Sequence, residues 1–233
     1  MMRAFKVVRG DMPTRFTLYA GPGVGKTQLT LALAKESFTQ GLYKCIFWIP
    51  ATTIEKLYQG FSKVLLLVGH PDRSEAEEMV KLTAARRWLE DFSSGNWLLV
   101  LDNVVQDTVD FLREHLPRKN NHGNILFTTR TKDVATALAH ASGEKHEVLE
   151  LRIPDEEDAA RLLLGHFEDG EIDGDENKAK EIVRCVGCLP LAIAQVAAYM
   201  KGTGSTLDSL LTLYKGEHKI DVGSTPDVLS GWK

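Results

Sequence analysis

Hydrophobic and polar positions divide the chain into two regions with different patterns. Up to residue 151, short apolar runs alternate with longer stretches in which apolar residues recur every three or four positions. This alternation predicts parallel strands joined by helices, and therefore an α/β domain over residues 1–152. The expected strands are Phe16–Ala20, Cys45–Pro50, Trp97–Leu101, Asn124–Thr129 and Glu147–Leu151. The run at 97–101 is apolar at every position, which is typical of a strand buried on both faces of a doubly wound sheet.

The stretches between these strands have helical periodicity. The expected helices are Lys26–Gln40, Thr52 to about Gly69, Ser74 to about Phe92, Thr108–Leu116 and Lys132–Ala141. Two of them begin with the spacing of a capping box, a threonine or serine followed three residues later by glutamate, at Thr52 with Glu55 and at Ser74 with Glu77. The buried face of the helix after Ser74 is expected to consist of Met79, Leu82, Ala85 and Leu89.

The strand pattern stops after residue 151, and only helical periodicity follows. The expected helices are Asp155 to about His166, Glu176–Val186, Leu189–Lys201 and Leu207–Tyr214. Asp155 is an expected N-cap, and the three acids after it suit the positive end of a helix. Residues 153–233 are therefore predicted to form a small, all-helical second domain.

Composition then narrows the class of protein. The chain has 233 residues, a net charge of −4 and no dense run of lysine or arginine, so no nucleic-acid partner is expected. The most apolar run, Val64–Val68, is too short to span a bilayer, and the first ten residues lack the apolar core of a signal peptide, so no membrane partner is expected. Three cysteines, an odd number, fit a reducing, cytoplasmic setting better than a disulfide framework.

Cys185 and Cys188 have the spacing of half a zinc site or of a redox pair. No second pair follows at zinc spacing, and the seven histidines are scattered without ligand spacing. Small thiols in the core are therefore the preferred interpretation.

The first candidate site is the segment Ala20–Thr27, Ala-Gly-Pro-Gly-Val-Gly-Lys-Thr, between an expected strand and an expected helix. Glycines allow backbone N–H groups to turn toward phosphate oxygens, and the following helix directs its positive end to the same place. In this P-loop pattern Lys26 reaches the β- and γ-phosphates of ADP or ATP, and the Thr27 hydroxyl binds Mg²⁺. The residues expected to contact the nucleotide here are Gly21, Gly23, Val24, Gly25, Lys26, Thr27 and Gln28. The alternative is a glycine-rich turn without a ligand.

The second candidate is Asp102, at the expected carboxyl end of the buried strand. Ligands of open α/β sheets bind at that edge, and beside a P-loop the carboxylate is the expected partner of Mg²⁺, directly or through water. The alternative is that Asp102 caps the next helix. Asn103 follows, where many ATPases place a second acid. An amide can orient water but cannot accept its proton, so slow hydrolysis of ATP is expected.

The third candidate is Arg130, which follows Thr128 and Thr129 at the end of a strand. A guanidinium matches phosphate in a fork, so Arg130 is expected to contact the γ-phosphate and, with Lys26 and Asp102, to complete a catalytic set. The alternative is a surface arginine paired with a loop acid. Thr128 is a weaker candidate for holding the attacking water.

With these motifs in this order, the chain resembles the NB-ARC family, a group of signalling NTPases in the STAND class of P-loop ATPases. The family is the nucleotide-binding core of plant disease-resistance receptors, apoptotic-protease activators and many fungal signalling proteins. Besides the P-loop, the similar segments are Leu98–Asn103, Asn124–Arg130, Val148–Ala159 and Cys185–Ala192. The segments Phe47–Ile49 and Trp97–Asn103 are most similar to fungal members, which often carry tetratricopeptide repeats.

The resemblance implies a fold, a ligand set and a mode of action. The sheet would have five strands in the order 5-1-4-3-2, followed by a helical domain of the ARC1 type. Arg130 would be the phosphate sensor, and Pro190 would contact the base or ribose from the helical domain. From its position alone, Pro190 is explained as a first-turn proline. ADP would hold a closed resting state, and ATP would favour an open state that forms homo-oligomers.

The resemblance also implies a longer chain, with an N-terminal effector and C-terminal repeats. The winged-helix domain, whose Met-His-Asp motif normally grips ADP, is absent from the 233 residues, so weaker nucleotide binding is expected. Three positions depart from the family pattern: Ala20 and Cys188 stand where glycine is usual, and Asn103 where aspartate is common. Ala20 is expected to restrict the first turn of the loop.

Two other functions stay open. One is a turnover ATPase, such as a remodelling or nucleic-acid-loading factor, which Asn103 and the absence of a basic run disfavour. The other is a binding platform that has lost its nucleotide function, which the intact Lys26, Thr27 and Asp102 disfavour.

Overall fold

A computed structural model gives the fold of the chain and describes residues 12–140, 146–168, 172 and 174–217. The chain divides into two compact units, and the division falls between Arg152 and Ile153. The predicted end of one helix at Ala141 and the last residues of the predicted helical domain lie outside the described residues.

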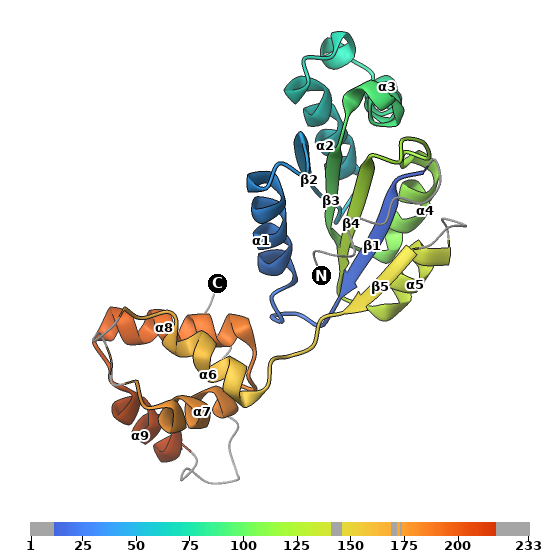
Figure 1. Cartoon of the computed structure of the whole chain (residues 1–233). Helices are drawn as coiled ribbons and strands as arrows, with labels where there is room; N and C mark the ends of the chain where they lie inside the picture. Colours follow the sequence, from blue (N-terminus) through green and yellow to red (C-terminus); the bar gives the residue numbers. More distant parts are fainter. Residues whose placement is uncertain (1–11, 141–145, 169–171, 173, 218–233) are drawn as a thin grey trace. The chain divides into compact units, whose positions relative to one another are not determined.

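The first unit is built on a five-stranded sheet in which every strand pair is parallel. The strands are β1 (Thr14–Tyr19), β2 (Cys45–Pro50), β3 (Trp97–Val104), β4 (Gly123–Thr129) and β5 (His146–Glu150). They lie side by side in the order β2-β3-β4-β1-β5 (Figure 1). This is the expected order read from the other edge, so the predicted α/β fold is confirmed. Because the strands are parallel, their carboxyl ends meet at one edge of the sheet.

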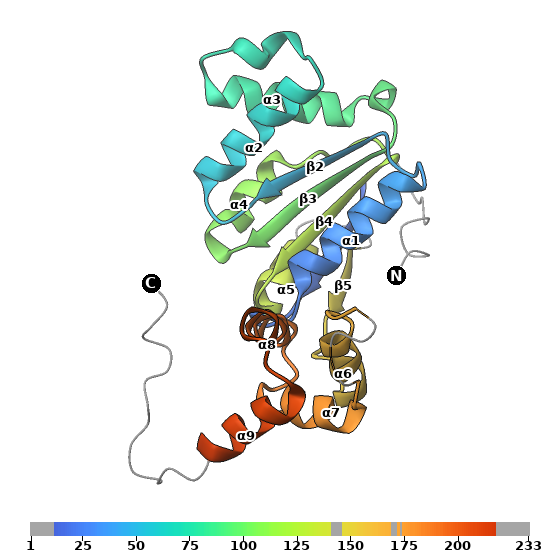
Figure 2. The same cartoon turned by 90° about the vertical axis from the view of Figure 1, so that its left-hand side faces the viewer.

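Helices cover both faces of this sheet, and one face carries more of them. The helices are α1 (Lys26–Thr39), α2 (Ile54–Leu67), α3 (Glu78–Glu90), α4 (Gln106–His115) and α5 (Lys132–His140). On one face, Leu98 and Val100 of β3 share a small buried cluster with Ala34 of α1. On the other, Leu99 and Leu101 belong to a larger cluster with residues of α2, α3, α4 and α5. Figure 2 shows α1 in front of the sheet and α4 and α5 behind it. Successive residues of β3 thus enter different cores, which explains why residues 97–101 are all apolar.

The beginning of α2 differs from the prediction by one residue. Thr53, rather than Thr52, is the N-cap, and its hydroxyl accepts a hydrogen bond from the backbone N–H of Lys56 at 3.3 Å. The hydroxyl of Thr52 instead accepts from the side chain of Lys56 at 2.9 Å. Two adjacent threonines can both cap a helix, so sequence spacing does not distinguish them.

The beginning of α3 was predicted too early. Ser74 does not open a capping box, because it ends a 3₁₀ turn at Pro71–Ser74 and the helix starts only at Glu78. Met79 therefore lies in the first turn and is 42% exposed, so its placement on the buried face was wrong. Leu82 is the first residue of this helix to enter the core.

The second unit consists of helices around an apolar centre. They are α6 (Glu156–Leu164), α7 (Glu176–Cys185), α8 (Pro190–Thr203) and α9 (Leu207–Glu217). Buried side chains such as Leu163, Ile182 and Ile193 form its core. The expected cap of α6 is confirmed, since the Asp155 carboxylate accepts the backbone N–H of Asp158 at 2.9 Å. No single helix among the described residues has the length and apolar character of a membrane span, and α7 with α8, which meet at a bend of 118°, pass such a test only as a pair.

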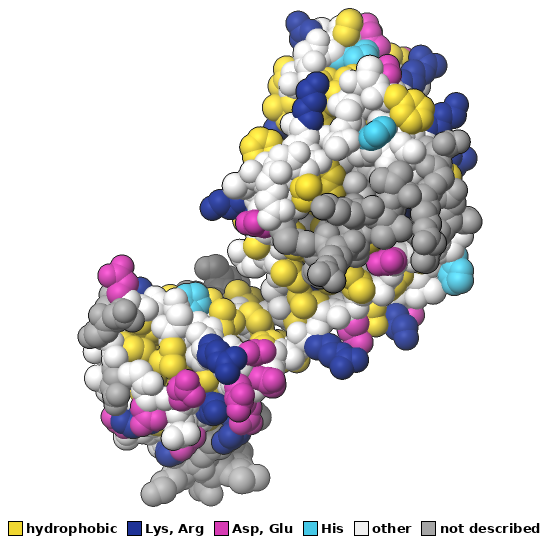
Figure 3. All heavy atoms as spheres, in the orientation of Figure 1, with side chains coloured by type: hydrophobic (Ala, Val, Ile, Leu, Met, Phe, Trp, Pro, Cys, Tyr) yellow, Lys and Arg dark blue, Asp and Glu magenta, His cyan; other side chains and the backbone are white. Residues whose placement is uncertain are grey.

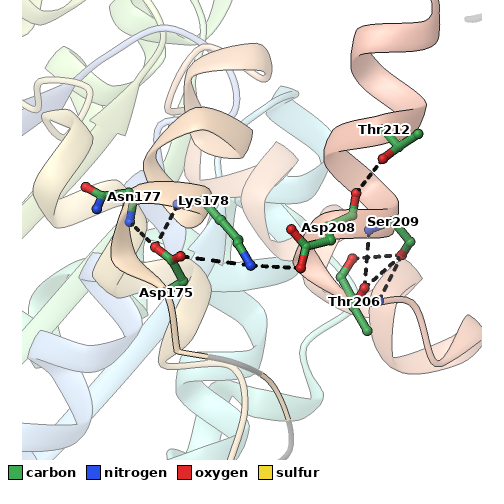
Figure 4. A network of polar contacts seen from close by, with 7 residues as sticks. All are labelled: Asp175, Asn177, Lys178, Thr206, Asp208, Ser209 and Thr212. Atoms are coloured by element: carbon green, nitrogen blue, oxygen red, sulfur yellow. Dashed lines mark hydrogen bonds and ion pairs between the residues drawn. The ribbon is translucent and has the colours of Figure 1, made fainter.

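A polar network joins α7 to α9 at the surface of this unit (Figure 4). Asp175 caps α7 and accepts the backbone N–H of Lys178 at 3.2 Å. The Nζ of Lys178 donates to the carboxylate of Asp208 in α9 at 2.7 Å. Thr206 directly precedes α9, and its hydroxyl accepts the backbone N–H of Ser209 at 3.2 Å. The Lys178–Asp208 pair is the contact of this network that crosses between the two helices, and an exposed pair of this kind contributes little stability.

The cysteines of the second unit occupy different environments. Cys188 is half-buried against the helical core, whereas Cys185 is exposed, and both are free thiols. The interpretation as core thiols was therefore wrong for Cys185. No group of three or more histidine, cysteine or acidic side chains is arranged for a metal ion in the described ranges, which gives no support to a zinc site.

Candidate functional site

The segment Ala20–Thr27 forms a loop between β1 and α1, as the sequence predicts. Two of its residues have left-handed backbone conformations, Gly23 with φ of 77° and Gly25 with φ of 97°. These conformations favour glycine, so both positions require it. Ala20 has no positive φ and is only 5% exposed. The expected restriction by Ala20 was therefore wrong, because the left-handed turns of the loop lie further along.

The start of α1 has the features of an anion site. Its N-cap, Gly25, offers no side chain to the free backbone N–H groups, and its first turn contains no acid. By contrast, α2, α6 and α7 each have a capping side chain, from Thr53, Asp155 and Asp175, and an acid in the first turn. Free N–H groups and the positive end of the helix dipole together attract an anion. Gln28 lies in this first turn and is exposed.

Lys26, the first residue of α1, folds back over its own loop. Its Nζ donates to the carbonyl oxygens of Ala20 and Gly21 at 2.8 and 2.9 Å. Partial burial lowers the pKa of Lys26, the positive charge of Arg130 lowers it further, and the carboxylate of Asp102 opposes both effects. Arg130 and Asp102 are thus close enough to act on the charge of Lys26, so the structure groups the three residues that the sequence singled out.

Thr27 and Asp102 face each other at the carboxyl edge of the sheet. The Thr27 hydroxyl lies 3.3 and 3.4 Å from the two carboxylate oxygens of Asp102. The prediction that Asp102 ends the strand was wrong, because β3 continues to Val104 and Asp102 lies within it. The alternative role as a helix cap is excluded, because the N-cap of α4 is Val105. A hydroxyl and a carboxylate are oxygen donors of the kind that Mg²⁺ prefers, and at this separation one hydrated cation can bind both.

An irregularity in β3 sets the direction of Asp102. The pairs of β3 with β4 on either side of it are Leu101 with Phe127 and Val104 with Thr129. Asp102 and Asn103 therefore both lie opposite Thr128, as in a β-bulge. Asn103 has φ of 61°, in the left-handed region that asparagine tolerates better than most residues.

Thr128 holds this bulge in place. Its buried hydroxyl donates to Oδ1 of Asp102 at 2.5 Å and accepts the backbone N–H of Asn103 at 2.8 Å. Because its proton is directed at the carboxylate, the geometry does not support the weaker expectation that Thr128 holds the attacking water. Sequence reasoning missed this contact because an apolar pattern does not reveal a bulge. The available signal was a polar residue near the end of a buried strand.

Arg130 and Pro190 lie where the sequence predicts. Arg130 follows β4 and is exposed, and within the described part of the chain it has no acidic partner, so the alternative of a surface ion pair is not supported. Pro190 belongs to the second unit and is the first residue of α8, where proline needs no ligand to explain it. The contact of Pro190 with a nucleotide, and the chemical roles of the other site residues, stay predictions.

Comparison with solved structures supports the fold of the chain. The fold is similar to that of Cdc6p from Pyrobaculum aerophilum, with a TM-score of 0.64 at 14% identity, over 100% of this chain and 67% of that one. It is also similar to the Walker-type ATPase paby2304 of Pyrococcus abyssi, with a TM-score of 0.56 at 13% identity, over 88% of this chain and 67% of that one. At such low identity the likeness concerns the fold alone. The fold and the loop before α1 define a P-loop NTPase.

Within this class, the chain belongs to the NB-ARC family. The model of the NB-ARC domain matches residues 5–165. A nucleotide-binding leucine-rich repeat (NLR)-like protein from Hyaloscypha variabilis is 30% identical over 209 residues, which cover 83% of this chain and 20% of the relative. The chain thus spans about a fifth of the length of this relative. Family and fold together make it a nucleotide-binding NTPase module.

Proposed function

We propose that the chain is the nucleotide-binding core of a signalling switch, which couples the phosphate state of bound ADP or ATP to domain arrangement and oligomerisation. The observation that carries this proposal is the convergence of two cations on an uncapped helix end. Lys26 is the first residue of α1. Partial burial is the largest cause of its lowered pKa, and the positive charge of Arg130 is the second. Like charges held together in this way are stabilised by a polyanion such as a diphosphate or triphosphate.

The residues around the loop have separate tasks in this proposal. To reach the phosphates, Lys26 must leave the carbonyl oxygens of Ala20 and Gly21, so the nucleotide replaces two existing hydrogen bonds. Backbone N–H groups would bind phosphate oxygens from Gly21, Gly23, Val24, Gly25, Lys26, Thr27 and Gln28. Thr27 and Asp102 would hold Mg²⁺, which neutralises phosphate charge when it is bound. Arg130 would contact the γ-phosphate and so distinguish ATP from ADP.

A switch is favoured over a turnover ATPase by the surroundings of Asp102. Its neighbour Asn103 cannot accept a proton from water, and the hydroxyl proton of Thr128 is already engaged by the carboxylate. Hydrolysis would then be slow, and the useful output is conformational. A nucleic-acid-loading ATPase is further disfavoured because Lys and Arg side chains on the face seen in Figure 3 are scattered among other types instead of gathered.

The proposal places this core in a longer, cytoplasmic protein. The Hyaloscypha relative, whose name describes it as nucleotide-binding leucine-rich repeat (NLR)-like, is about five times as long as the segment it shares with this chain. An N-terminal effector and C-terminal repeats would flank the core, and Pro190 would contact the base or ribose. Three free cysteines support a reducing setting.

The proposal is tested first by calorimetry with Mg-ADP and Mg-ATP on the wild type and Lys26→Ala. Loss of charge-assisted bonds to phosphate should weaken binding by about ten- to a hundredfold. Lys35→Ala is the matched control, since Lys35 is an exposed lysine of the same helix and should leave affinity unchanged. Equal affinities of Lys26→Ala and the wild type would overturn nucleotide binding at this loop.

A second measurement separates a switch from a turnover ATPase. Phosphate release should stay below roughly one per second, which is low among enzymes. Small-angle scattering of the ADP-bound and ATP-bound chain should differ if phosphate state sets domain arrangement. Faster release with identical scattering would favour the turnover ATPase.

A further inference from the structure

The Thr128 hydroxyl links the candidate metal carboxylate to the backbone of the bulge. It donates to Oδ1 of Asp102 at 2.5 Å and accepts from the N–H of Asn103 at 2.8 Å. We propose that Thr128 is a positioning residue, which fixes the Asp102 carboxylate toward Thr27 so that the pair can bind a divalent cation. This inference rests on the proposed nucleotide function and adds to it the residue that pre-arranges the metal site.

The two hydrogen bonds act on different parts of Asp102. The bond to Oδ1 fixes the rotation of the carboxylate, whose oxygens lie 3.3 and 3.4 Å from the Thr27 hydroxyl. The bond from Asn103 fixes the backbone immediately after Asp102, where the chain is in a left-handed conformation. A bulge re-aims the side chains of its strand, so a bulge held from both sides gives the carboxylate one direction.

Thr128 is itself held rigidly enough to do this. It is 1% exposed and pairs with Leu18 of β1 on the side away from β3. A hydroxyl has one proton to donate and lone pairs to accept, and both capacities are used here. Partners that orient metal ligands from behind in this way typically affect metal affinity by about 10- to 100-fold.

The neighbouring Thr129 provides a matched control. It is also 1% exposed, and its hydroxyl also donates to β3, but to the backbone carbonyl of Val104 at 2.8 Å. Replacing either threonine by valine keeps the size of the side chain and removes one buried hydroxyl from the same strand. Only Thr128→Val removes a bond to a carboxylate.

The test compares Thr128→Val, Thr128→Ser and Thr129→Val by calorimetry. ADP affinity is first measured in the presence of EDTA. In a separate titration without EDTA, Mg²⁺ is added to the ADP-saturated protein. We expect Thr128→Val to bind ADP in EDTA as the wild type does, and to bind Mg²⁺ about 10- to 100-fold more weakly. Thr128→Ser keeps the hydroxyl and should restore Mg²⁺ affinity, and Thr129→Val should leave it unchanged.

The outcomes separate this inference from the function on which it rests. Wild-type Mg²⁺ affinity in Thr128→Val, or an equal loss of Mg²⁺ affinity in Thr129→Val, would overturn the positioning role while nucleotide binding stands. The positioning role would also be overturned if the wild type bound ADP equally well with and without Mg²⁺. A wild type that binds no ADP would overturn the proposed function too. If Thr128→Val does not fold, Thr128→Ser decides, since loss of Mg²⁺ affinity with the hydroxyl present contradicts the inference.

Discussion

Lys26 and Arg130 are two cations at the same edge of the sheet, where partial burial and then the charge of Arg130 lower the pKa of the Lys26 ammonium. A bound phosphate would act in the opposite direction, because a nearby negative charge favours the protonated amine. Proton release from Lys26 is therefore easier without nucleotide than with it.

The first prediction is that nucleotide binding takes up protons at alkaline pH. The affinity for ADP should fall as pH rises through the lowered pKa of free Lys26, because the deprotonated lysine must regain a proton on binding. Calorimetry in two buffers of different ionisation enthalpy measures this uptake. Lys26→Arg, whose guanidinium keeps its proton, should abolish it, and persistence of the uptake in that variant would assign it to another group.

The second prediction concerns Arg130, which the proposal makes the sensor of the γ-phosphate. Arg130→Ala should leave ADP affinity nearly unchanged and weaken ATP binding by about ten- to a hundredfold, the worth of a charge-assisted hydrogen bond. Arg87→Ala, at an exposed arginine of α3, changes net charge equally and should alter neither affinity. A parallel loss of ADP and ATP affinity in Arg130→Ala would argue against a sensor.

The third prediction follows from the left-handed backbone of Asn103. Asn103→Val should lower the free energy of unfolding by about 1–2 kcal/mol, since a β-branched residue is strained at a φ of 61°. Asn103→Gly should cost less than half as much, because glycine adopts this conformation freely. Urea unfolding measures both, and equal costs would show that lost side-chain contacts outweigh backbone strain.

The fourth prediction concerns the packing of α2 on β2. A Cβ at Gly60 would lie 2.3 Å from Cγ2 of the buried Ile49, so Gly60→Ala should destabilise the first unit by about 1–3 kcal/mol despite the helix preference of alanine. Gly202→Ala in α8, where a Cβ meets nothing within 4 Å, is the control and should stabilise by up to about 1 kcal/mol.

A double variant checks the cause of that effect. Ile49→Ala removes the Cγ atoms that the new methyl group would meet, so Gly60→Ala should cost less in that background. An undiminished cost would place the strain elsewhere.

The fold could be predicted from the sequence because its signals are repeated along the chain. The alternation of apolar runs with helical periodicity reports burial, and burial decides both the strands and the helices that cover them. The P-loop was equally clear, because Gly23 and Gly25 occupy the two positions where the backbone needs left-handed conformations. The order of the strands came from the resemblance to a family, since periodicity carries no information about which strands pair.

What could not be predicted depends on single contacts. Thr52 and Thr53 are chemically equivalent as caps, and only the path of the backbone selects one. The bulge at Asp102 and Asn103 arises from the register between β3 and β4, so the identity of neither residue predicts it. The role of Thr128 in holding Asp102 follows from that bulge and was therefore missed.

His146 is a further residue that no sequence motif marks. It begins β5, its Nε2 lies 2.6 Å from the Thr17 hydroxyl, and its ring stacks on Phe127 with centroids 5.5 Å apart. Burial, and to a lesser extent the charge of Arg15, lower its pKa from 6.5 to about 4. The native state therefore holds this imidazole neutral under conditions where an exposed histidine is protonated.

The last prediction is that the first unit loses stability in mild acid through His146. Because its folded pKa lies below the unfolded value, the unfolded state binds more protons between pH 6.5 and about 4. Stability should be fully present above that window and fall by about 2 kcal/mol between pH 6.5 and about 5, before most carboxylates titrate. Urea unfolding followed by the fluorescence of Trp48, Trp88 and Trp97, which lie in this unit, measures the slope. His146→Gln should flatten it and the exposed His140→Gln should not. An unchanged slope in His146→Gln would trace the acid sensitivity to other groups, since glutamine cannot take up the proton that unfolding gives to histidine.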